Sequence, residues 1–209
     1  MVKSIESLIR RSLVISWSRL NTWEQGEQTY VKKYIYGEEY TNKRMEFGSW
    51  VAKVLEIVLD PDTDDKETGD IGIDQARMFL PRFPKREYPI KVKFGKIPIQ
   101  ARMDMCNPKQ GWIGEVKTGT TNWTQKVVDS SGQLTFYALS YLIKFGAFPK
   151  RITLYHLPTD VTGDNIKLTG EVREFETKRG LIDMATMGKR IEKAYEGIIK
   201  VTKKHYDTL

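Results

Sequence analysis

Two acidic residues and a lysine lie near one another in the middle of the sequence, within the segment DMCNPKQGWIGEVKTG at residues 104–119. Asp104 comes before a polar turn, and Glu115 and Lys117 come after it in an otherwise apolar stretch. If the two flanks pair as a hairpin, the carboxylates approach each other, and the period of two in a strand places Glu115 and Lys117 on one face. Close carboxylates repel unless a cation lies between them, and Mg²⁺ is commonly held by one or two carboxylates together with phosphate and water. The segment therefore predicts a site for a hard divalent cation.

The chemistry expected of such a site is hydrolysis of a phosphate ester. A divalent cation lowers the pKa of its bound water, and a neighbouring ammonium orients that water or stabilises charge developing on the phosphate. A structural salt bridge is the alternative interpretation. A second acid-x-lysine occurs at Glu176 and Lys178, with Asp164 upstream. We favour the first occurrence because WIGEVK lies between turns, as a strand would, whereas ETK begins a polar helix.

The elements that must position these residues follow from hydrophobic periodicity and turn residues. An antiparallel meander of three strands is predicted at residues 88–94, 97–105 and 112–118, with the turns GK and NPKQG between them. In this arrangement Asp104 ends one strand and Glu115 lies in the next.

A helix is predicted after the meander, at residues 130–146, with a capping box of Ser130 and Gln133 and a stop at Gly146. The remaining elements are expected in the order strand, strand and helix, at residues 151–157, 170–177 and 178–204.

The N-terminal part of the sequence predicts helices. Ser16 or Ser18 can cap a helix that carries Leu20 and Trp23, and residues 45–59 have the periodicity of a second helix. An acidic loop, DPDTDDKETGD, begins at Asp60. We interpret it as a solvated loop and not as a calcium site, because Asp65 stands where an EF-hand requires glycine and Ile71 where it requires glutamate.

This order of elements predicts an α/β fold in one domain spanning residues 1–209. A central mixed sheet with an antiparallel meander would be flanked by helices, with a helical N-terminal section at residues 1–60. The core would occupy residues 88–176, and residues 177–209 would form a closing helix.

Composition narrows the class of protein further. The sequence has no apolar run near the roughly 18 residues of a membrane span, so we expect no membrane partner, and the use of a single cysteine predicts a reducing, cytoplasmic setting. The single cysteine, Cys106, excludes a disulfide framework within the chain and any four-cysteine metal site. A formal net charge of +7 favours a polyanionic partner, because lysine and arginine release counterions when they neutralise phosphates.

Five stretches together resemble the RecB-type, lambda-exonuclease-like branch of the PD-(D/E)XK nuclease superfamily. ARMDM is similar to that branch's aspartate strand, GEVKTG to its E-x-K strand and QLTFYAL to its Q-x-x-x-Y helix. ISWSRLNTWEQ and FGSWVAKVLE are similar to its two N-terminal signatures. The resemblance implies a restriction-endonuclease-like core and a metal-dependent DNA nuclease.

The resemblance also implies roles for individual residues. Asp104, Glu115 and the Val116 carbonyl would hold Mg²⁺ or Mn²⁺, and Lys117 would be the catalytic lysine. Gln133 and Tyr137 are four residues apart and share a helix face, which in the family looks toward the active site. Packing in the core is the alternative for Tyr137, and helix capping is the alternative for Gln133.

The sequence departs from the family pattern at two places. The family's helix histidine falls at Ala52, and Glu56, one turn beyond, could supply a carboxylate or could simply face solvent. His156 and His205 lie elsewhere and are expected to be structural or exposed. The cluster-bearing relatives have a cysteine where this chain has Gly26, so no iron–sulfur cluster is expected.

Contacts to DNA are predicted in TYVKKYIYGEEYTNKR, where tyrosines alternate with basic residues. Aromatic rings that stack on bases beside cations that follow phosphates hold single strands without sequence readout. The candidates are Lys32, Lys33, Tyr34, Lys43 and Arg44. The alternative is that these tyrosines pack a helix onto the core.

We therefore expect a metal-dependent DNA nuclease, in the first place an exonuclease of recombination or repair from a phage or other mobile element. The competing hypothesis is a catalytically weak scaffold that binds DNA ends or a recombination partner, and Ala52 is its main support. A restriction-type endonuclease is a third hypothesis. A recombination or single-strand-annealing protein and a second copy of the chain are the protein partners considered, in a bacterial or phage-infected cell.

Overall fold

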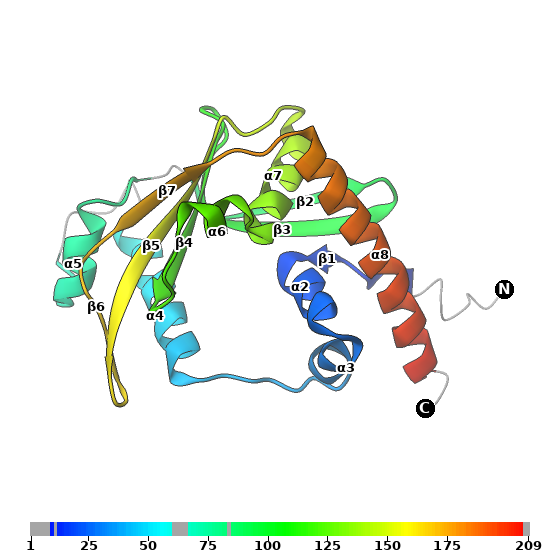
Figure 1. The fold of residues 1–209 in the computed structure, drawn as a ribbon, viewed down its shortest axis with the longest axis horizontal. Helices are drawn as coiled ribbons and strands as arrows, with labels where there is room; N and C mark the ends of the chain where they lie inside the picture. Colours follow the sequence, from blue (N-terminus) through cyan, green and yellow to red (C-terminus); the bar gives the residue numbers. More distant parts are fainter. Residues whose placement is uncertain (1–8, 11, 60–66, 83–84, 207–209) are drawn as a thin grey trace.

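The computed structural model describes residues 9–10, 12–59, 67–82 and 85–206. Figure 1 shows a strongly twisted sheet with helices on both faces. Within the described residues the sheet has seven strands. The predicted fold class, a central mixed sheet with an antiparallel meander and flanking helices, is confirmed.

The meander forms the centre of the sheet. Its strands are β2 (Lys85–Phe94), β3 (Ile97–Asn107) and β4 (Trp112–Gly119). They pair antiparallel in sequence order, as the turns predicted. A short strand, β1 (Ile15–Ser16), pairs parallel to β3 near its start, on residues that β4 does not reach. The β3 residues between these two partners therefore border an opening in the sheet.

The next strand, β5 (Arg151–Thr162), runs parallel to β4 and is reached through two helices, α6 (Gln125–Asp129) and α7 (Gly132–Phe145). On its other side β5 pairs antiparallel with β6 (Asn165–Leu168) and β7 (Arg173–Thr177). The crossover is needed because parallel neighbours cannot be joined by a tight turn. It brings the first turn of α7 beside β4.

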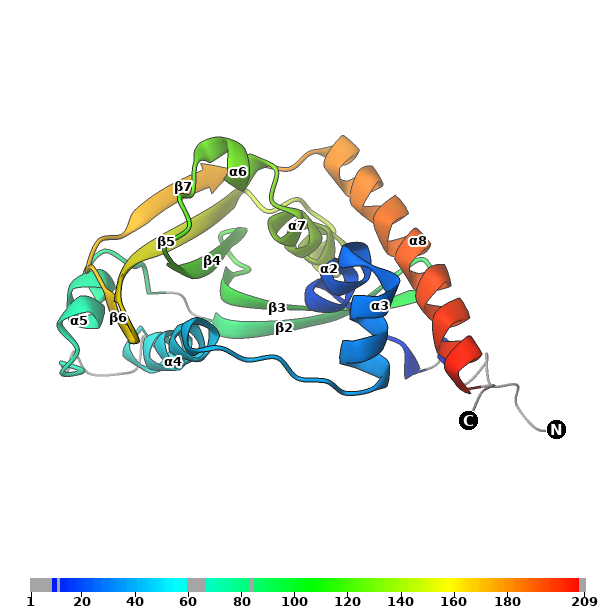
Figure 2. The same cartoon turned by 60° about the horizontal axis from the view of Figure 1, so that its bottom comes forward.

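Two apolar clusters cover the faces of the sheet. Helices α2 (Trp17–Gln25), α7 and α8 (Leu181–Tyr206) cover one face around Leu20, Phe136 and Ile191. Helices α4 (Lys43–Val58) and α5 (Ile71–Arg77) cover the other around Val51 and Ile73. Figure 2 shows the two groups of helices at opposite ends of the molecule, joined by the chain between η1 (Val31–Ile35), which follows α3 (Glu27–Tyr30), and α4.

The helix ends agree with the expected caps except at the start of α7. Ser16 caps α2 by accepting from the Arg19 backbone N–H, and Gly146 ends α7 in the left-handed conformation at φ 72°. The predicted capping box of Ser130 and Gln133 is wrong by one residue. Ser131 caps α7 through the Leu134 N–H, whereas Ser130 closes α6. The side chain of Gln133 is consequently available for another contact.

Several elements differ from the expectation. The strand predicted at residues 170–177 is only β7, and β6 and the short helices α5 and α6 were not predicted. These elements have four to seven residues, too few for a clear hydrophobic period. Most of the acidic loop, at residues 60–66, lies outside the described residues. Among the described helices, none combines the length and apolarity that a membrane span requires.

Candidate active site

The two acids meet where the β3–β4 ladder stops. The last pair of the ladder is Met105 with Gly114, and one step further in the same register Asp104 would face Glu115. At that step the strands do not pair. Instead, Oδ2 of Asp104 accepts a hydrogen bond from the Val116 backbone N–H at 2.8 Å. The carboxylate of Asp104 therefore lies beside Glu115 at the opening in the sheet.

Glu115 is a buried carboxylate in which only one of the two oxygens accepts hydrogen bonds from the described residues. Its side chain is 3% exposed, and its Oε1 accepts from Lys117 Nζ at 2.6 Å and from Gln133 Nε2 at 2.6 Å. Its Oε2 is buried and has no hydrogen-bond partner among the described residues. Burial, followed by the negative charge of Asp104, raises the pKa of Glu115 to about 8, although Lys117 acts in the opposite direction. A buried polar atom without a partner is costly, so this oxygen is suited to an additional positive ligand.

Lys117 lies at the edge of the same site. Its side chain is 33% exposed, so the ammonium can reach both Glu115 and solvent. Burial lowers the pKa of Lys117, but the charge and hydrogen bond of Glu115 outweigh that effect and the pKa is raised overall. Lys117 therefore remains a cation in this environment.

The first turns of α7 complete the polar network. Gln133 Nε2 also lies 2.9 Å from the Tyr137 hydroxyl oxygen, to which it donates. Tyr137 is only 6% exposed, and its pKa is raised by burial and then by the charges of Glu115 and Asp104. Core packing and a place in the site therefore both apply to Tyr137, since its ring packs in the core and its hydroxyl belongs to the polar network. Gln133 does not cap the helix and instead holds Glu115.

Helix α4 forms the opposite wall of a cavity of about 560 Å³ that includes Asp104, Glu115 and Lys117. Gly48 permits the close approach, because a Cβ there would lie 3.0 Å from Thr118 Oγ1. Ala52 lines the cavity, at the place where the resemblance predicts a histidine. Glu56 is exposed and is not one of the lining residues.

Glu87 is a further acid of this cavity that sequence reasoning missed. It lies on β2 opposite Asp104 in the β2–β3 register, at a step where the two strands do not pair. Its φ of 45° is the only positive φ of a non-glycine residue in the described chain, and such strain is concentrated at functional sites. Its Oε2 lies 3.4 Å from Arg102 Nε. A glutamate in a strand carries no sequence signal for this conformation.

The basic residues proposed for DNA contact line the active-site cavity and two hollows next to it. Arg44 lines the cavity, which shares Met45 with a hollow lined by Lys32 and Lys33. Lys43 lines a second adjacent hollow, where it forms an ion pair of 2.5 Å with Asp164.

Tyr34 belongs to a different part of the molecule. Its ring stacks on Tyr30 with the ring centroids 5.0 Å apart, and its hydroxyl donates to Ser18 at 3.4 Å. The packing interpretation therefore describes Tyr34 and Tyr30, whereas Tyr36 and Tyr40 are 63% and 78% exposed.

The remaining candidates lie away from the acids. His156 is buried, and its Nε2 lies 3.0 Å from the Gly119 carbonyl oxygen. In the second acid-x-lysine, Glu176 forms an ion pair with Arg151 at 3.0 Å, and Lys178 is exposed. Neither histidine lines the cavity.

The donor set fits a divalent cation in part. Within the described residues no three acidic, histidine or cysteine side chains converge as a preformed cluster. Asp104 and the unpartnered oxygen of Glu115 are nevertheless hard oxygen ligands at one cavity wall, and Mg²⁺ needs only one or two carboxylates.

Several solved structures share the fold of this chain. No protein-family model matches the sequence, and no match is found among curated proteins. A candidate exonuclease of Eubacterium rectale superposes with a TM-score of 0.57 and 10% identity, covering 98% of this chain and 87% of the other. A phage-related exonuclease of Haemophilus somnus 129PT gives 0.51 and 12%, covering 94% and 99%. The fold is that of these exonucleases.

An alkaline exonuclease of Laribacter hongkongensis is a third such neighbour, with a TM-score of 0.50, 13% identity, and coverage of 93% of this chain and 94% of the other. The resemblance to the lambda-exonuclease-like branch is therefore confirmed for the fold. At these identities the likeness concerns the fold alone, so the roles of individual residues rest on the geometry above.

Proposed function

We propose that this protein is a metal-dependent DNA exonuclease that hydrolyses phosphodiester bonds. The observation that carries the proposal is the buried Oε2 of Glu115, which has no hydrogen-bond partner in the described part of the chain, beside Asp104 and with Lys117 at the edge of the same cavity. An exonuclease-like fold around this site supports it.

Asp104, Glu115 and the Val116 carbonyl would hold Mg²⁺ or Mn²⁺. When bound, such an ion supplies a water of lowered pKa and positive charge beside the phosphate. The ammonium of Lys117 orients the attacking water or stabilises charge on the phosphate. Gln133 holds the carboxylate of Glu115 in place through its side-chain amide.

The path proposed for DNA follows the start of α4. The site cavity shares Met45 with the hollow of Lys32 and Lys33, and it shares Asn42 and Arg44 with the hollow of Lys43. Phosphates along this path would meet these cations beside the acids. The net charge of +7 is consistent with a nucleic-acid substrate.

We place the activity in recombination or repair, with a recombination or single-strand-annealing protein as a candidate partner and a homo-oligomer as a candidate assembly. Support for this context comes from the phage-related exonuclease among the similar folds.

A second candidate function is a scaffold that binds DNA ends without cutting. Ala52 favours it, because its methyl group faces the cavity where the family's metal-holding histidine would lie. Glu56 does not line the cavity to replace it.

The test is a time course on linear DNA labelled separately at each end, beside a closed circle, with Mg²⁺, Mn²⁺ or chelator. We expect metal-dependent loss from one end and an intact circle. Glu115→Ala and Lys117→Ala should reduce the rate by on the order of a hundredfold or more. Lys178→Ala is the matched control, because that exposed lysine belongs to the second acid-x-lysine. Undiminished cleavage by Lys117→Ala would remove the site assignment.

If the wild-type chain does not cut with either metal, histidine is introduced as Ala52→His. Recovered cleavage would identify a nuclease disabled at one position. Continued absence of cleavage, with DNA still bound, would support the scaffold.

A further inference from the structure

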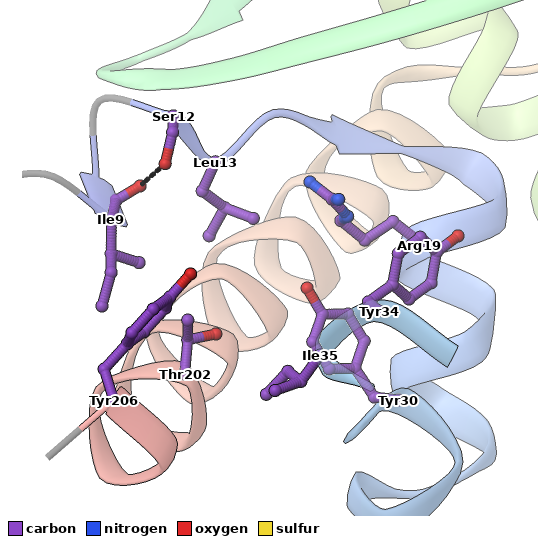
Figure 3. Close-up of a pocket in the computed structure, with 9 residues that line it drawn as sticks. All are labelled: Ile9, Ser12, Leu13, Arg19, Tyr30, Tyr34, Ile35, Thr202 and Tyr206. Atoms are coloured by element: carbon purple, nitrogen blue, oxygen red, sulfur yellow. Dashed lines mark hydrogen bonds between the residues drawn. The ribbon is translucent and has the colours of Figure 1, made fainter. Parts of the chain in front are cut away.

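A second cavity lies apart from the candidate active site, between the N-terminal segment, α2, η1 and the end of α8, as Figure 3 shows. It has a volume of about 450 Å³ and shares no lining residue with the cavity of Asp104 and Glu115. Its apolar walls include Ile9, Leu13 and Ile35. Small-molecule sites in proteins have volumes of roughly 300–1,000 Å³ and mostly apolar walls with a few polar groups, so this cavity has the size of a ligand site.

The polar group that points to a ligand is the hydroxyl of Tyr30. Tyr30 is 2% exposed, and its ring packs against Trp23 and Tyr34. In Figure 3 the hydroxyl is directed into the cavity. No described residue accepts or donates a hydrogen bond with it, whereas the hydroxyl of Tyr34 donates to Ser18. Burial raises the pKa of Tyr30 despite the opposing charge of Arg19, so the group keeps its proton and can donate.

Arg19 supplies the charge of the cavity. One guanidinium nitrogen donates to the Val14 carbonyl oxygen at 3.0 Å, and the group lies 4.7 Å from the centroid of the Tyr34 ring. Among the described residues, Arg19 forms no ion pair, and none of those that line the cavity is acidic. A guanidinium with several unused N–H donors beside a hydroxyl donor favours an anionic group, because charge-assisted hydrogen bonds are stronger than neutral ones.

We propose that this cavity binds a nucleoside 5′-monophosphate. The phosphate would lie between Arg19 and the hydroxyl of Tyr30, and the base would pack among the aliphatic walls and the ring of Tyr206, which is 56% exposed at the cavity. The ligand combines an anion, for Arg19 and Tyr30, with a planar base whose faces can pack against apolar side chains. The inference rests on the proposed function, because an exonuclease releases mononucleotides and so supplies this ligand near the protein.

The test is calorimetric titration of the full chain with thymidine 5′-monophosphate in the presence of chelator. We expect saturable binding whose Kd rises at least about tenfold in Tyr30→Phe and in Arg19→Gln. Tyr30→Phe removes only the hydroxyl and keeps the packed ring, so it separates ligand contact from folding. Thymidine and inorganic phosphate, used as separate probes, should each bind at least about tenfold more weakly because each lacks one half of the ligand.

Matched controls come from the same region and from the active site. Tyr36→Phe alters an exposed tyrosine near the cavity, and Arg44→Gln alters the arginine of the active-site cavity. Neither should change the Kd. A Kd that responds to Arg44→Gln and not to Arg19→Gln would place the nucleotide in the active site and overturn the proposal, and so would the absence of binding at millimolar nucleotide.

The DNA cleavage assay, run on the same proteins, separates the two proposals. Cleavage together with nucleotide binding unaffected by Tyr30→Phe would refute this inference and leave the exonuclease standing. Absence of cleavage together with Arg19-dependent binding would refute the exonuclease and leave the nucleotide site.

Discussion

Glu115 shows how a single side chain links the stability of the protein to its chemistry. It is buried beside Asp104, its Oε1 is shared by Lys117 and Gln133, and its Oε2 has no partner among the described residues. Burial and the neighbouring acid raise its pKa to about 8. Without a bound cation, Glu115 therefore stays protonated in the folded protein up to a higher pH than in the unfolded chain.

This pKa predicts a pH dependence of stability with a definite sign. Because the folded pKa of about 8 lies above the unmodified value of 4.5, the folded state binds the extra proton between these values. The contribution of Glu115 to stability therefore falls as pH rises through that window. In chelator, the Tm of wild type relative to Glu115→Gln should be lower at pH 8 than at pH 5, by several degrees. The pKa of His156 is lowered, so its contribution to stability rises with pH. The difference in Tm between wild type and Glu115→Gln removes that contribution, because both proteins contain His156.

Added Mg²⁺ or Mn²⁺ should raise the Tm of wild type more at pH 8 than at pH 6, since the cation competes with the proton for Glu115. Glu115→Gln should lose most of that response. An equal metal response at both pH values would contradict the assignment of Glu115 as a ligand.

At the scale of elements, the site depends on the approach of α4 to β4. Gly48 lies where a Cβ would be 3.0 Å from Thr118 Oγ1. The same helix places Ala52 on the cavity wall. A glycine inside a helix costs about 1 kcal/mol relative to alanine, so its presence in α4 indicates that close packing outweighs helix propensity.

The corresponding prediction is a coupling between Gly48→Ala and Thr118→Ala. With Thr118 present, Gly48→Ala should stabilise the protein little or not at all, because the Thr118 side chain must move to make room for the added methyl group. In the Thr118→Ala background it should stabilise by about 1 kcal/mol, so a double-mutant cycle in urea should give a coupling of at least about 0.5 kcal/mol. Additive effects of the two substitutions would show that this contact does not limit the approach of α4.

At the scale of the whole molecule, Arg179 connects segments that are distant in sequence. It is 8% exposed, and it donates to Thr135 at 2.7 Å, to Thr177 at 2.6 Å and to the Val128 carbonyl oxygen at 3.0 Å. It thereby ties the end of β7 and the entry to α8 to the turn between α6 and α7. That turn precedes Gln133, so the hydrogen bonds of Arg179 also support the active site.

Arg179→Met should destabilise the protein by about 3 kcal/mol or more, because several buried acceptors lose their donor together. Lys178→Met, one residue earlier and exposed, should change stability by less than about 0.5 kcal/mol. Chemical denaturation at neutral pH measures both. Similar small effects in the two variants would mean that water satisfies the acceptors around Arg179 as well as the guanidinium does.

Much of the candidate site was predictable because its residues are close in sequence. Asp104, Glu115 and Lys117 lie on two strands joined by a short turn, so local pairing alone brings them together. The capping box was misplaced by one residue, since Ser130 and Ser131 offer the same hydroxyl and only the backbone path selects between them. Glu56 lies one turn beyond Ala52 on α4, but it is exposed and does not line the cavity.

The sequence by itself determined the meander, the helix ends at Ser16 and Gly146, and the acid pair, because hydrophobic period, turn residues and caps act over a few residues. The tertiary structure alone decided that Gln133 reaches Glu115, that Glu87 joins the cavity in a strained conformation, and that the Tyr30 hydroxyl opens into a second cavity. These contacts depend on a parallel crossover, on strands that separate and on helices packed from opposite ends of the chain. Such long-range geometry is set by the packing of the whole core and leaves no local pattern in the sequence.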